Sequence, residues 1–537
     1  MDVILHTSST KGDNILTTIT SLTATEIAQK IKARELSASE VVEAHVRRIK
    51  EVNPRVNAVV IPLFEQARKE AEAADAAQRR GDVLGLLHGV PVTIKEQFRV
   101  KDTATTFGLP HQKNHRATED GPLVKRLRNA GAIILGKTNT AQLLFYIESD
   151  NELYGRTNNP WNLERSPGGS SGGEAAIIAA GGSPLGLGGD FGGSIRQPAH
   201  FCGIQGLKPT AGRLTNFDTR PGFLSWGLLE GIPPQSGPMA RSVADLALAM
   251  NVLAAPGLER VDPSVPPVPW PTWKDVSVRG LRIAMYTDDG YFKASPAIRR
   301  VVTEAADALR TLGAQVEPWT PPDVNEAMRF FFSIFSADAF NGLRHALGSD
   351  KPAPQISGLL QSGNMSGLMR KFVAGMMRNS GQIRLSHIVA QTGGRSAEAY
   401  WQLLEERNTY RLRFLGAMEA GRFDAIICPP TSLPAVLHGS TTNLPDFDSY
   451  ARLFNVLGMP AGVVAASRVR AGEESDRPSS KDPVERAASQ VEKGSIGLPV
   501  GVQVAARHWR EDVVLAVMSA LESRFRTQAD YPAQPPI

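Results

Sequence analysis

One glycine-rich stretch constrains the fold of this chain more than any other feature of its sequence. Between residues 166 and 210, about a dozen glycines surround two serine-centred loops, SPGGSSGG and GGDFGGS. Glycine lets the backbone adopt positive φ and approach a ligand closely, as an anion-binding nest of N–H groups requires. The second loop can direct consecutive N–H groups to one point beside a serine hydroxyl, as in an oxyanion hole. These groups belong to Phe191, Gly192, Gly193 and Ser194. A turn or a flexible connector is the ordinary alternative.

The composition is that of a globular protein. Of 537 residues, 42% are hydrophobic and 21% are charged, which is enough apolar material for a large core. The 59 basic and 54 acidic residues nearly balance, and no basic block could follow a phosphate backbone. We therefore expect no nucleic-acid partner.

The cysteines and the amino terminus indicate the compartment. Cys202 and Cys428 are the only cysteines, too few for a disulfide framework or a thiolate metal site. The first 20 residues read as a polar tail, without the pattern of a signal peptide or a run of about 20 apolar residues. We expect a reducing cytoplasm, no bound metal and no transmembrane segment.

Two helices are predicted within residues 22–52. Thr23–Glu26 and Ser37–Glu40 each match a capping box, in which a Ser or Thr and a Glu three residues later bond to each other's backbone. Apolar residues at helical spacing follow both. The second helix is expected to end near Pro54.

The rest of the chain alternates between strand and helix patterns. Residues 86–95, LLHGVPVTIK, predict a strand whose last residue, Lys95, lies on the face opposite Val92 and Ile94. Strand and helix patterns also alternate over residues 123–135 and 282–319. This alternation predicts an α/β fold.

The ordered motifs resemble the amidase signature family. The resemblance runs from GGSSGGEAA through GGDFGGSIRQPA to GLKPT. It extends upstream to GVPVTIKE and GKTNT, and downstream to SGPMARSVADLAL, FDAIICPPTSLPA, NVLGMPAG and GLPVGVQV. Within the family the chain is similar to the fatty acid amide hydrolase branch, notably in RSAEAYWQL. The resemblance implies one domain over residues 1–537, with a signature core at 86–250 and a twisted mixed β-sheet covered by α-helices on both faces.

The resemblance also implies a Ser-Ser-Lys triad that needs no cofactor. The family's nucleophile falls on Ser194, its bridging serine on Ser170 and its catalytic lysine on Lys95. The oxyanion N–H groups fall on residues 191–194. Supporting positions fall on Asp190, Arg196 and Ser171. An acyl pocket is implied at Leu143, Leu144, Phe145 and Ile147, for which core packing is the ordinary interpretation.

Chemistry restricts how Lys95 can act. A serine hydroxyl is a weak nucleophile until a base removes its proton, and a lysine is a base only when neutral. Lowering a lysine pKa from about 10.4 by about three units costs roughly 4 kcal/mol, which burial can supply. The apolar sequence VPVTIKEQF around Lys95 favours such burial.

The implied reaction is hydrolysis of a small-molecule carboxylic amide to an acid and an amine through an acyl-enzyme. The apolar acyl-pocket positions indicate a hydrophobic acyl or aryl group. Hydrolysis of esters or carbamates is one alternative. Another is the role of an amidotransferase component, which works within a complex on charged transfer RNA. A homodimer is also implied.

Two later segments are expected at the surface. Residues 367–378, GLMRKFVAGMMR, place their apolar side chains on one helical face beside Arg370, Lys371 and Arg378. Core packing is the ordinary interpretation. The alternative is an apolar lip of a substrate-entrance cap at residues 355–395 that touches a membrane surface. Residues 468–494 are charged and poor in apolar residues, which predicts a surface insertion.

Two further motifs suggest other chemistry. Gly131–Thr138 fits the phosphate-loop formula GxxxxGKT, although its four inner residues are apolar, as in a buried strand. Gly168–Gly172 fits the GxSxG nucleophile elbow, whose triad requires a downstream histidine. His438 and His508 are the candidates for that histidine.

Overall fold

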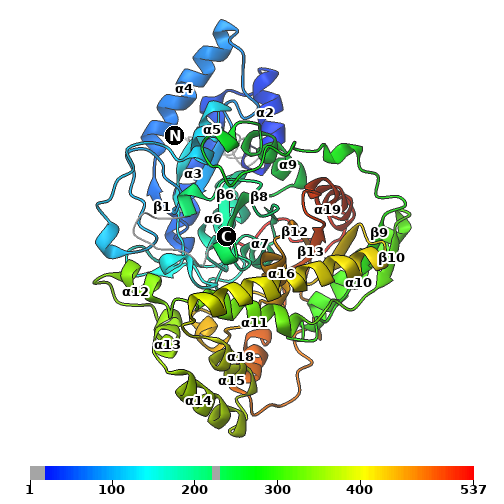
Figure 1. Cartoon of the computed structure of the whole chain (residues 1–537). Helices are drawn as coiled ribbons and strands as arrows, with labels where there is room; N and C mark the ends of the chain where they lie inside the picture. The colour runs from blue at the N-terminus through cyan, green and yellow to red at the C-terminus, as the bar shows by residue number, and fades with distance from the viewer. Residues whose placement is uncertain (1–18, 220–229) are drawn as a thin grey trace, which may run out of the picture.

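The centre of the protein is a mixed sheet of 11 strands surrounded by helices (Figure 1). The computed structural model describes residues 19–219 and 230–537. In order across the sheet, the strands are β1 (Val59–Pro62), β3 (Ile133–Thr138), β2 (Pro91–Lys95), β6 (Leu185–Asp190), β8 (Gln235–Ala240), β7 (Gln205–Lys208), β12 (Ala461–Arg468), β13 (Pro499–Ala506), β11 (Ala425–Cys428), β9 (Arg282–Met285) and β10 (Gln315–Pro318). A separate ribbon pairs β4 (Asp150–Asn151) with β5 (Gly155–Arg156).

Both faces of the central strands are covered. Every residue of β2, β6, β8 and β13 is buried, as expected when helices pack on both sides of a sheet. Helices α7 (Arg196–Cys202) and α19 (Glu511–Phe525) both contact β12 and β13. The predicted α/β fold with a mixed sheet is confirmed.

The predicted amino-terminal helices are present. Helices α2 (Ala24–Lys32) and α3 (Ala38–Val56) each begin with the expected capping box. The second helix extends two residues beyond Pro54, near which it was predicted to end, and Pro54 lies inside its last turn. Asn57 follows the last helical residue, Val56; it adopts a left-handed conformation and donates its N–H to the carbonyl of Asn53. The tail predicted at residues 1–20 falls almost wholly outside the described residues.

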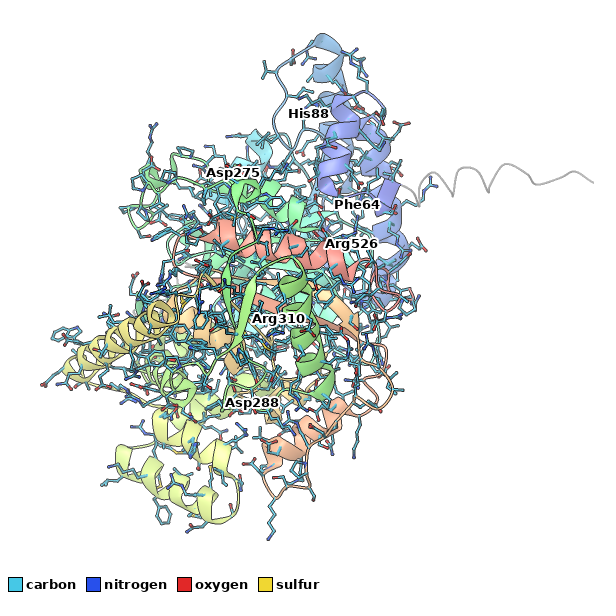
Figure 2. All side chains as sticks on the ribbon, turned by 90° about the vertical axis from the view of Figure 1, so that its right-hand side faces the viewer. Phe64, His88, Asp275, Asp288, Arg310 and Arg526 are labelled. Atoms are coloured by element: carbon cyan, nitrogen blue, oxygen red, sulfur yellow. The ribbon has the colours of Figure 1, made fainter. Side chains whose placement is uncertain are left out.

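The strand–helix–strand unit predicted over residues 282–319 is also found. Strands β9 and β10 pair in parallel, joined by α10 (Pro296–Thr311), the helix that carries Arg310 (Figure 2). The remaining helices are α4 (Phe64–Arg80), α5 (Pro122–Asn129), α6 (Gly172–Ala179), α9 (Val243–Leu253), α11 (Val324–Phe335), α12 (Asn341–Leu347), α13 (Pro354–Gly363), α14 (Gly367–Asn379), α15 (Ile383–Gln391), α16 (Ala397–Ala420), α17 (Ser449–Leu457) and α18 (Pro483–Glu492).

The Met-rich segment at residues 367–378 forms α14, but its apolar face is not part of the core. Leu368, Met369, Phe372 and Met376 are exposed, and Ala374 is the buried residue of this helix. The core-packing interpretation is therefore wrong for this face. Within residues 19–219 and 230–537, no helix is long and apolar enough to cross a membrane.

The segment at residues 468–494 includes an ordered helix. Helix α18 buries Val484, Ala488 and Val491. Arg477, whose side chain is 2% exposed, pairs with Glu492. The charged residues of the segment 468–494 therefore include a buried ion pair, and the helix in this segment packs one face against the protein.

Strand order brings two distant parts of the chain to one edge of the sheet. Strands β2 and β6 are neighbours and run parallel, so their carboxyl ends lie side by side. Lys95 ends β2 and Asp190 ends β6. Ligands of α/β sheets bind beyond the carboxyl ends of parallel strands, so this edge is where a site is expected.

Candidate active site

Lys95 is buried at the carboxyl end of β2. Its Nζ donates a hydrogen bond to Oγ of Ser170 over 2.8 Å and lies 3.4 Å from the carbonyl oxygen of Gly189. Burial lowers the pKa of Lys95 to about 7, although Asp190 and, in its charged form, Glu174 act in the opposite direction. A substantial fraction of this amine is therefore neutral near neutral pH.

Glu174 lies close to the lysine without forming an ion pair with it. This residue of α6 accepts hydrogen bonds from the hydroxyls of Thr93 (2.6 Å) and Thr138 (2.9 Å). Burial raises the pKa of Glu174 to about 8, against the effect of these two hydroxyls. A carboxyl that is largely protonated at neutral pH leaves the neutral form of Lys95 favoured.

Asp190 organises the loop that carries Ser194. Its carboxylate accepts hydrogen bonds from the N–H groups of Gly193 (2.8 Å) and Ile195 (3.1 Å), and from the guanidinium of Arg196 (3.0 Å). Burial alone would raise the pKa of Asp190, but the charge and hydrogen bonds of Arg196 hold it well below its usual range. One of the four predicted oxyanion N–H groups, that of Gly193, is therefore engaged by this carboxylate.

Ser171 supports the same region from the first glycine loop. Its Oγ lies 3.2 Å from the carbonyl oxygen of Gly189 and 3.3 Å from the backbone nitrogen of that residue. Its backbone N–H donates to the carbonyl of Ser194. The two glycine-rich loops are thus bonded together, which fixes Ser170 and Ser194 relative to each other.

The three predicted triad residues line one small cavity. It has a volume of about 40 Å³ and is bounded by Lys95, Ser170 and Ser194, together with Asp190 and Phe191. Ser194 is only 5% exposed. Two serine hydroxyls and one lysine amine are therefore gathered in one small cavity.

A second, larger cavity meets the first at Ser194. Its volume is about 330 Å³, and Phe145, Phe191 and Phe335 form part of its wall. The rings of Phe145 and Phe335 stack with centroids 4.4 Å apart. Such a mainly apolar cavity suits a hydrophobic group bound beside the serine.

The four predicted acyl-pocket residues divide between the two cavities. Leu144 and Phe145 line both, Leu143 lines only the small one, and Ile147 lines only the large one. Residues of α13 and α15, including Leu359 and Ile388, also line the large cavity. Part of the predicted cap segment thus forms a wall of this cavity.

The two competing motifs do not form the sites that their formulas suggest. The phosphate-loop match ends in strand β3, where Lys137 is fully buried and donates to Oγ1 of Thr105. His438 and His508 each have a ring nitrogen bonded to a backbone carbonyl, of Leu163 and Leu457 respectively. Neither histidine lines the cavity around Ser170.

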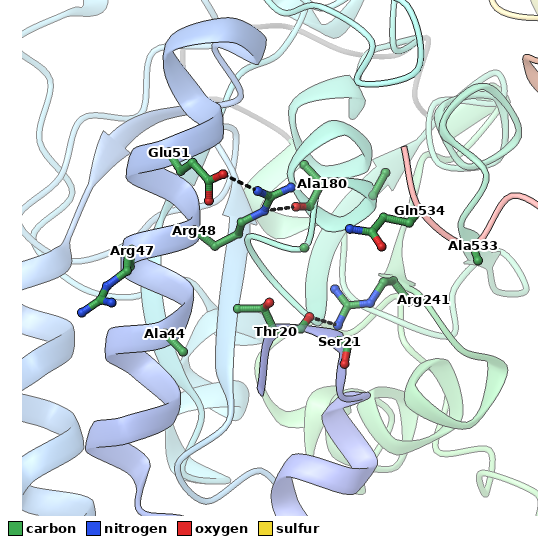
Figure 3. Close-up of a pocket in the computed structure, with 12 residues that line it drawn as sticks. Thr20, Ser21, Ala44, Arg47, Arg48, Glu51, Ala180, Arg241, Ala533 and Gln534 are labelled. Atoms are coloured by element: carbon green, nitrogen blue, oxygen red, sulfur yellow. Dashed lines mark hydrogen bonds and ion pairs between the residues drawn. The ribbon is translucent and has the colours of Figure 1, made fainter. Parts of the chain in front are cut away.

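A third cavity, of about 450 Å³, lies between α3 and the carboxyl-terminal residues (Figure 3). Two arginines that line it are already engaged. Arg48 donates to the carbonyl of Ala180 and pairs with Glu51. Arg241 donates to the carbonyls of Thr20 and Leu22. Two of the three arginines that line this cavity are therefore bound to the protein itself.

Several residues of the site were not predicted from the sequence. Asn455 donates to Asp190 over 3.0 Å, and Gln503 accepts from Arg196 over 2.8 Å. Both residues lie in motifs that carry the family resemblance, NVLGMPAG and GLPVGVQV, so these motifs could have indicated that the two residues belong to the site. Glu174 is the single charge in the apolar sequence GGEAAIIAA, which was a signal that it is buried with specific partners.

Among the described residues, no three His, Cys, Asp or Glu side chains are grouped to bind a metal ion.

Comparison with known proteins identifies the family of the chain. A family model described as Amidase matches residues 40–515. The chain is 34% identical over 503 residues to fatty-acid amide hydrolase 1 of Sus scrofa, covering 93% of this chain and 84% of that protein. It is 32% identical over 531 residues to a component of the glutamyl-tRNA(Gln) amidotransferase of Geobacillus stearothermophilus, covering 95% and 98%. A solved structure of fatty acid amide hydrolase matches with a TM-score of 0.80 at 28% identity, over 95% of this chain and 86% of that one. The chain therefore belongs to the amidase family and is an amide-hydrolysing enzyme.

Proposed function

We propose that the protein cleaves amides of hydrophobic carboxylic acids with a Ser-Ser-Lys triad. One observation carries this proposal: the buried Lys95 amine bonds to the Ser170 hydroxyl over 2.8 Å, in the same cavity as Ser194. A base, a hydroxyl that relays protons and a nucleophile are the groups that acyl transfer requires.

The reaction begins with two proton transfers. Neutral Lys95 takes a proton from Ser170 as Ser170 takes one from Ser194, and Oγ of Ser194 attacks the amide carbon. The tetrahedral intermediate collapses when Ser170 returns a proton to the leaving nitrogen, so that the C–N bond breaks and the amine departs. Water then hydrolyses the acyl ester on Ser194 through the same relay.

The oxyanion of the intermediate needs N–H donors in the Ser194 loop. Because the N–H of Gly193 donates to Asp190, we assign this role to the N–H groups of Phe191, Gly192 and Ser194. Arg196 and Asp190 fix the loop and do not touch the substrate.

The acyl group is assigned to the 330 Å³ cavity. Its aromatic wall and its contact with Ser194 suit a long alkyl or aryl group. We therefore expect kcat/KM to increase from short to long acyl chains, because each buried CH₂ contributes about 0.8 kcal/mol.

A panel of amides with increasing acyl groups tests this function. The purified protein is incubated with acetamide, aryl anilides and oleamide, and the released amine or ammonia is measured. We expect cleavage that favours the apolar acyl groups, and unchanged rates for His438→Ala and His508→Ala. Loss of activity in either histidine variant would support the histidine triad instead.

The amidotransferase alternative makes the opposite prediction for the isolated chain. Similarity to the amidotransferase component is also high, and a protein with that role works within a complex on charged transfer RNA. If no simple amide, ester or carbamate is cleaved by the isolated protein, that alternative is favoured. Cleavage of esters or carbamates in preference to amides would identify the other alternative.

We also propose that α14 rests on a lipid surface, which would bring apolar substrates to the cap at residues 355–395. Leu368 is 82% exposed and Phe372 is 64% exposed, with Arg370, Lys371 and Arg378 on the same helix. An exposed apolar face flanked by cations is typical of helices that bind anionic membranes.

Flotation with vesicles tests the lipid contact. We expect wild-type protein to float with vesicles of phosphatidylcholine and phosphatidylglycerol. The double variant Leu368→Ser, Phe372→Ser is expected to lose about tenfold or more in binding, since two apolar side chains are removed. Its activity on a water-soluble anilide serves as the folding control. Wild-type protein that stays unbound would contradict the proposal.

A homodimer and a cytoplasmic location stay predictions.

A further inference from the structure

Gln97 is a buried side chain in the active-site cavity whose amide group has no protein partner among the described residues. It lies two residues after Lys95 and is 1% exposed. Neither its Nε2 nor its Oε1 bonds to any residue within 19–219 or 230–537. Buried polar side chains are almost always hydrogen-bonded. An amide left without such a partner therefore points to a bound molecule that completes its hydrogen bonds.

The Gln97 amide lies beside the end of strand β6. It lies against Gly189, since a Cβ placed on this glycine would be 2.9 Å from Oε1 and 3.1 Å from Nε2. Gln97 and Gly189 line the 40 Å³ cavity together with Lys95, Ser170 and Ser194. The amide thus borders the same small space as the proposed base, relay and nucleophile.

A second buried group without a partner lies on the same face of the sheet. Ser236 pairs with Gly189 across strands β6 and β8, and directly opposed residues place their side chains on one face. The hydroxyl of Ser236 is fully buried and bonds to no described residue. Pro234, two residues earlier, lines the cavity itself. Ser236 is therefore a second buried polar group without a described partner, next to the residues that line this cavity.

We infer that Gln97 is a positioning residue that holds the water molecule for hydrolysis of the acyl-enzyme, with Ser236 as a second contact. This inference rests on the acyl-enzyme of the proposed function. A water molecule needs about 10–15 Å³ and two to four polar partners, and the cavity of about 40 Å³ supplies both. The Gln97 amide offers both an acceptor oxygen and N–H donors, so it can orient a water lone pair toward the acyl carbon.

The step balances with the groups in this cavity. As the water oxygen forms a bond to the acyl carbon, Ser170 takes a proton from the water and passes its own proton to neutral Lys95. The tetrahedral intermediate then collapses, and the bond between the acyl carbon and Oγ of Ser194 breaks. Ser194 recovers a proton from Ser170, which is reprotonated by Lys95. The free acid leaves and the triad returns to its starting state.

Competition between water and hydroxylamine for the acyl-enzyme tests the inference. A p-nitrophenyl ester of a medium-chain fatty acid is hydrolysed in the presence of hydroxylamine, and the hydroxamate and acid products are measured for wild type and for Gln97→Met. Methionine has a similar volume but cannot hold a water. Hydroxylamine is a stronger nucleophile that depends less on orientation, so we expect the hydroxamate-to-acid ratio to rise about tenfold or more. Ser236→Ala is expected to shift the ratio in the same direction by less.

Stability distinguishes a positioning role from a structural one. The midpoint of thermal unfolding of Gln97→Met is expected to be unchanged or higher, because an amide without a protein partner is removed. The matched control is Gln142→Met, since Gln142 is also buried but bonds to the carbonyl of Lys351 and the N–H of Ala353. This control is expected to unfold at a lower temperature with an unchanged product ratio.

An unchanged product ratio in Gln97→Met would overturn the inference about Gln97 but not the proposed function. Equal losses of acid and hydroxamate with a lower unfolding midpoint would do the same. If wild type forms no hydroxamate and Ser194→Ala stays active, the acyl-enzyme and the proposed function fail together with it.

Discussion

Replacing Ser194 or Lys95 by alanine is expected to lower kcat/KM for amide hydrolysis by about 10⁴-fold. The first change removes the nucleophile, and the second removes the base that activates it through Ser170. The measurement is amine release from the best amide substrate. Lys95→Arg is the informative companion, because a guanidinium keeps the positive charge but cannot accept a proton in this pH range. We expect it to be as inactive as Lys95→Ala.

The pH profile of the wild type checks the same assignment. Lys95 acts as a base only in its neutral form, and burial lowers its pKa to about 7. The neutral fraction rises with pH, so kcat/KM should increase about tenfold per pH unit below 7 and level off above about pH 8. Activity that is constant between pH 5 and 8, or a Lys95→Arg variant with full activity, would rule out the lysine as base. Circular dichroism of each variant excludes unfolding as the cause of inactivity.

Replacing Arg196 by methionine is expected to lower the free energy of unfolding by about 3–5 kcal/mol. Arg196 and Asp190 are both fully buried and are joined by a hydrogen bond of 3.0 Å. The substitution leaves a carboxylate buried without its counter-charge, which costs more than the pair itself contributes. Urea unfolding followed by tryptophan fluorescence measures the change.

Arg80→Met is the matched control for this substitution. Arg80 pairs with Asp82 at the surface, where the two side chains are 62% and 45% exposed, and such a pair contributes about 1 kcal/mol or less. An equal loss of stability in both variants would contradict the assignment of Asp190 and Arg196 as the anchor of the loop.

Acid provides a second check on the buried pair. The folded-state pKa of Asp190 is held well below its usual range, so its contribution to stability is present at neutral pH. This contribution is lost as pH falls below about 4, where the carboxyl of the unfolded chain takes up a proton. Arg196→Met is expected to lose much of this acid dependence.

Much of the fold was predictable from local patterns. The capping boxes at Ser37 and Thr23 and the strand ending at Lys95 depend on residues close together in sequence, so their physical causes are visible there. Helix α3 extends two residues beyond Pro54, because the left-handed conformation of Asn57 ends the helix. The apolar face of α14 was ambiguous, because the same helical periodicity results from core packing and from an exposed lip.

The proposed reactive groups were identified from the sequence through the resemblance of its motifs to the amidase signature family. A hydroxyl in a glycine-rich loop, a second serine and a lysine in an apolar strand restrict the chemistry, whatever the details of packing. The protonation state of Lys95 required the folded structure, since its pKa depends on burial and on the charges of Asp190 and Glu174. The folded structure was also required to see that the N–H of Gly193 donates to Asp190. It was required as well to see that Gln97 lines the cavity and that its amide has no partner among the described residues. These properties arise from contacts between segments far apart in the chain, and local sequence patterns do not specify the partners in such contacts.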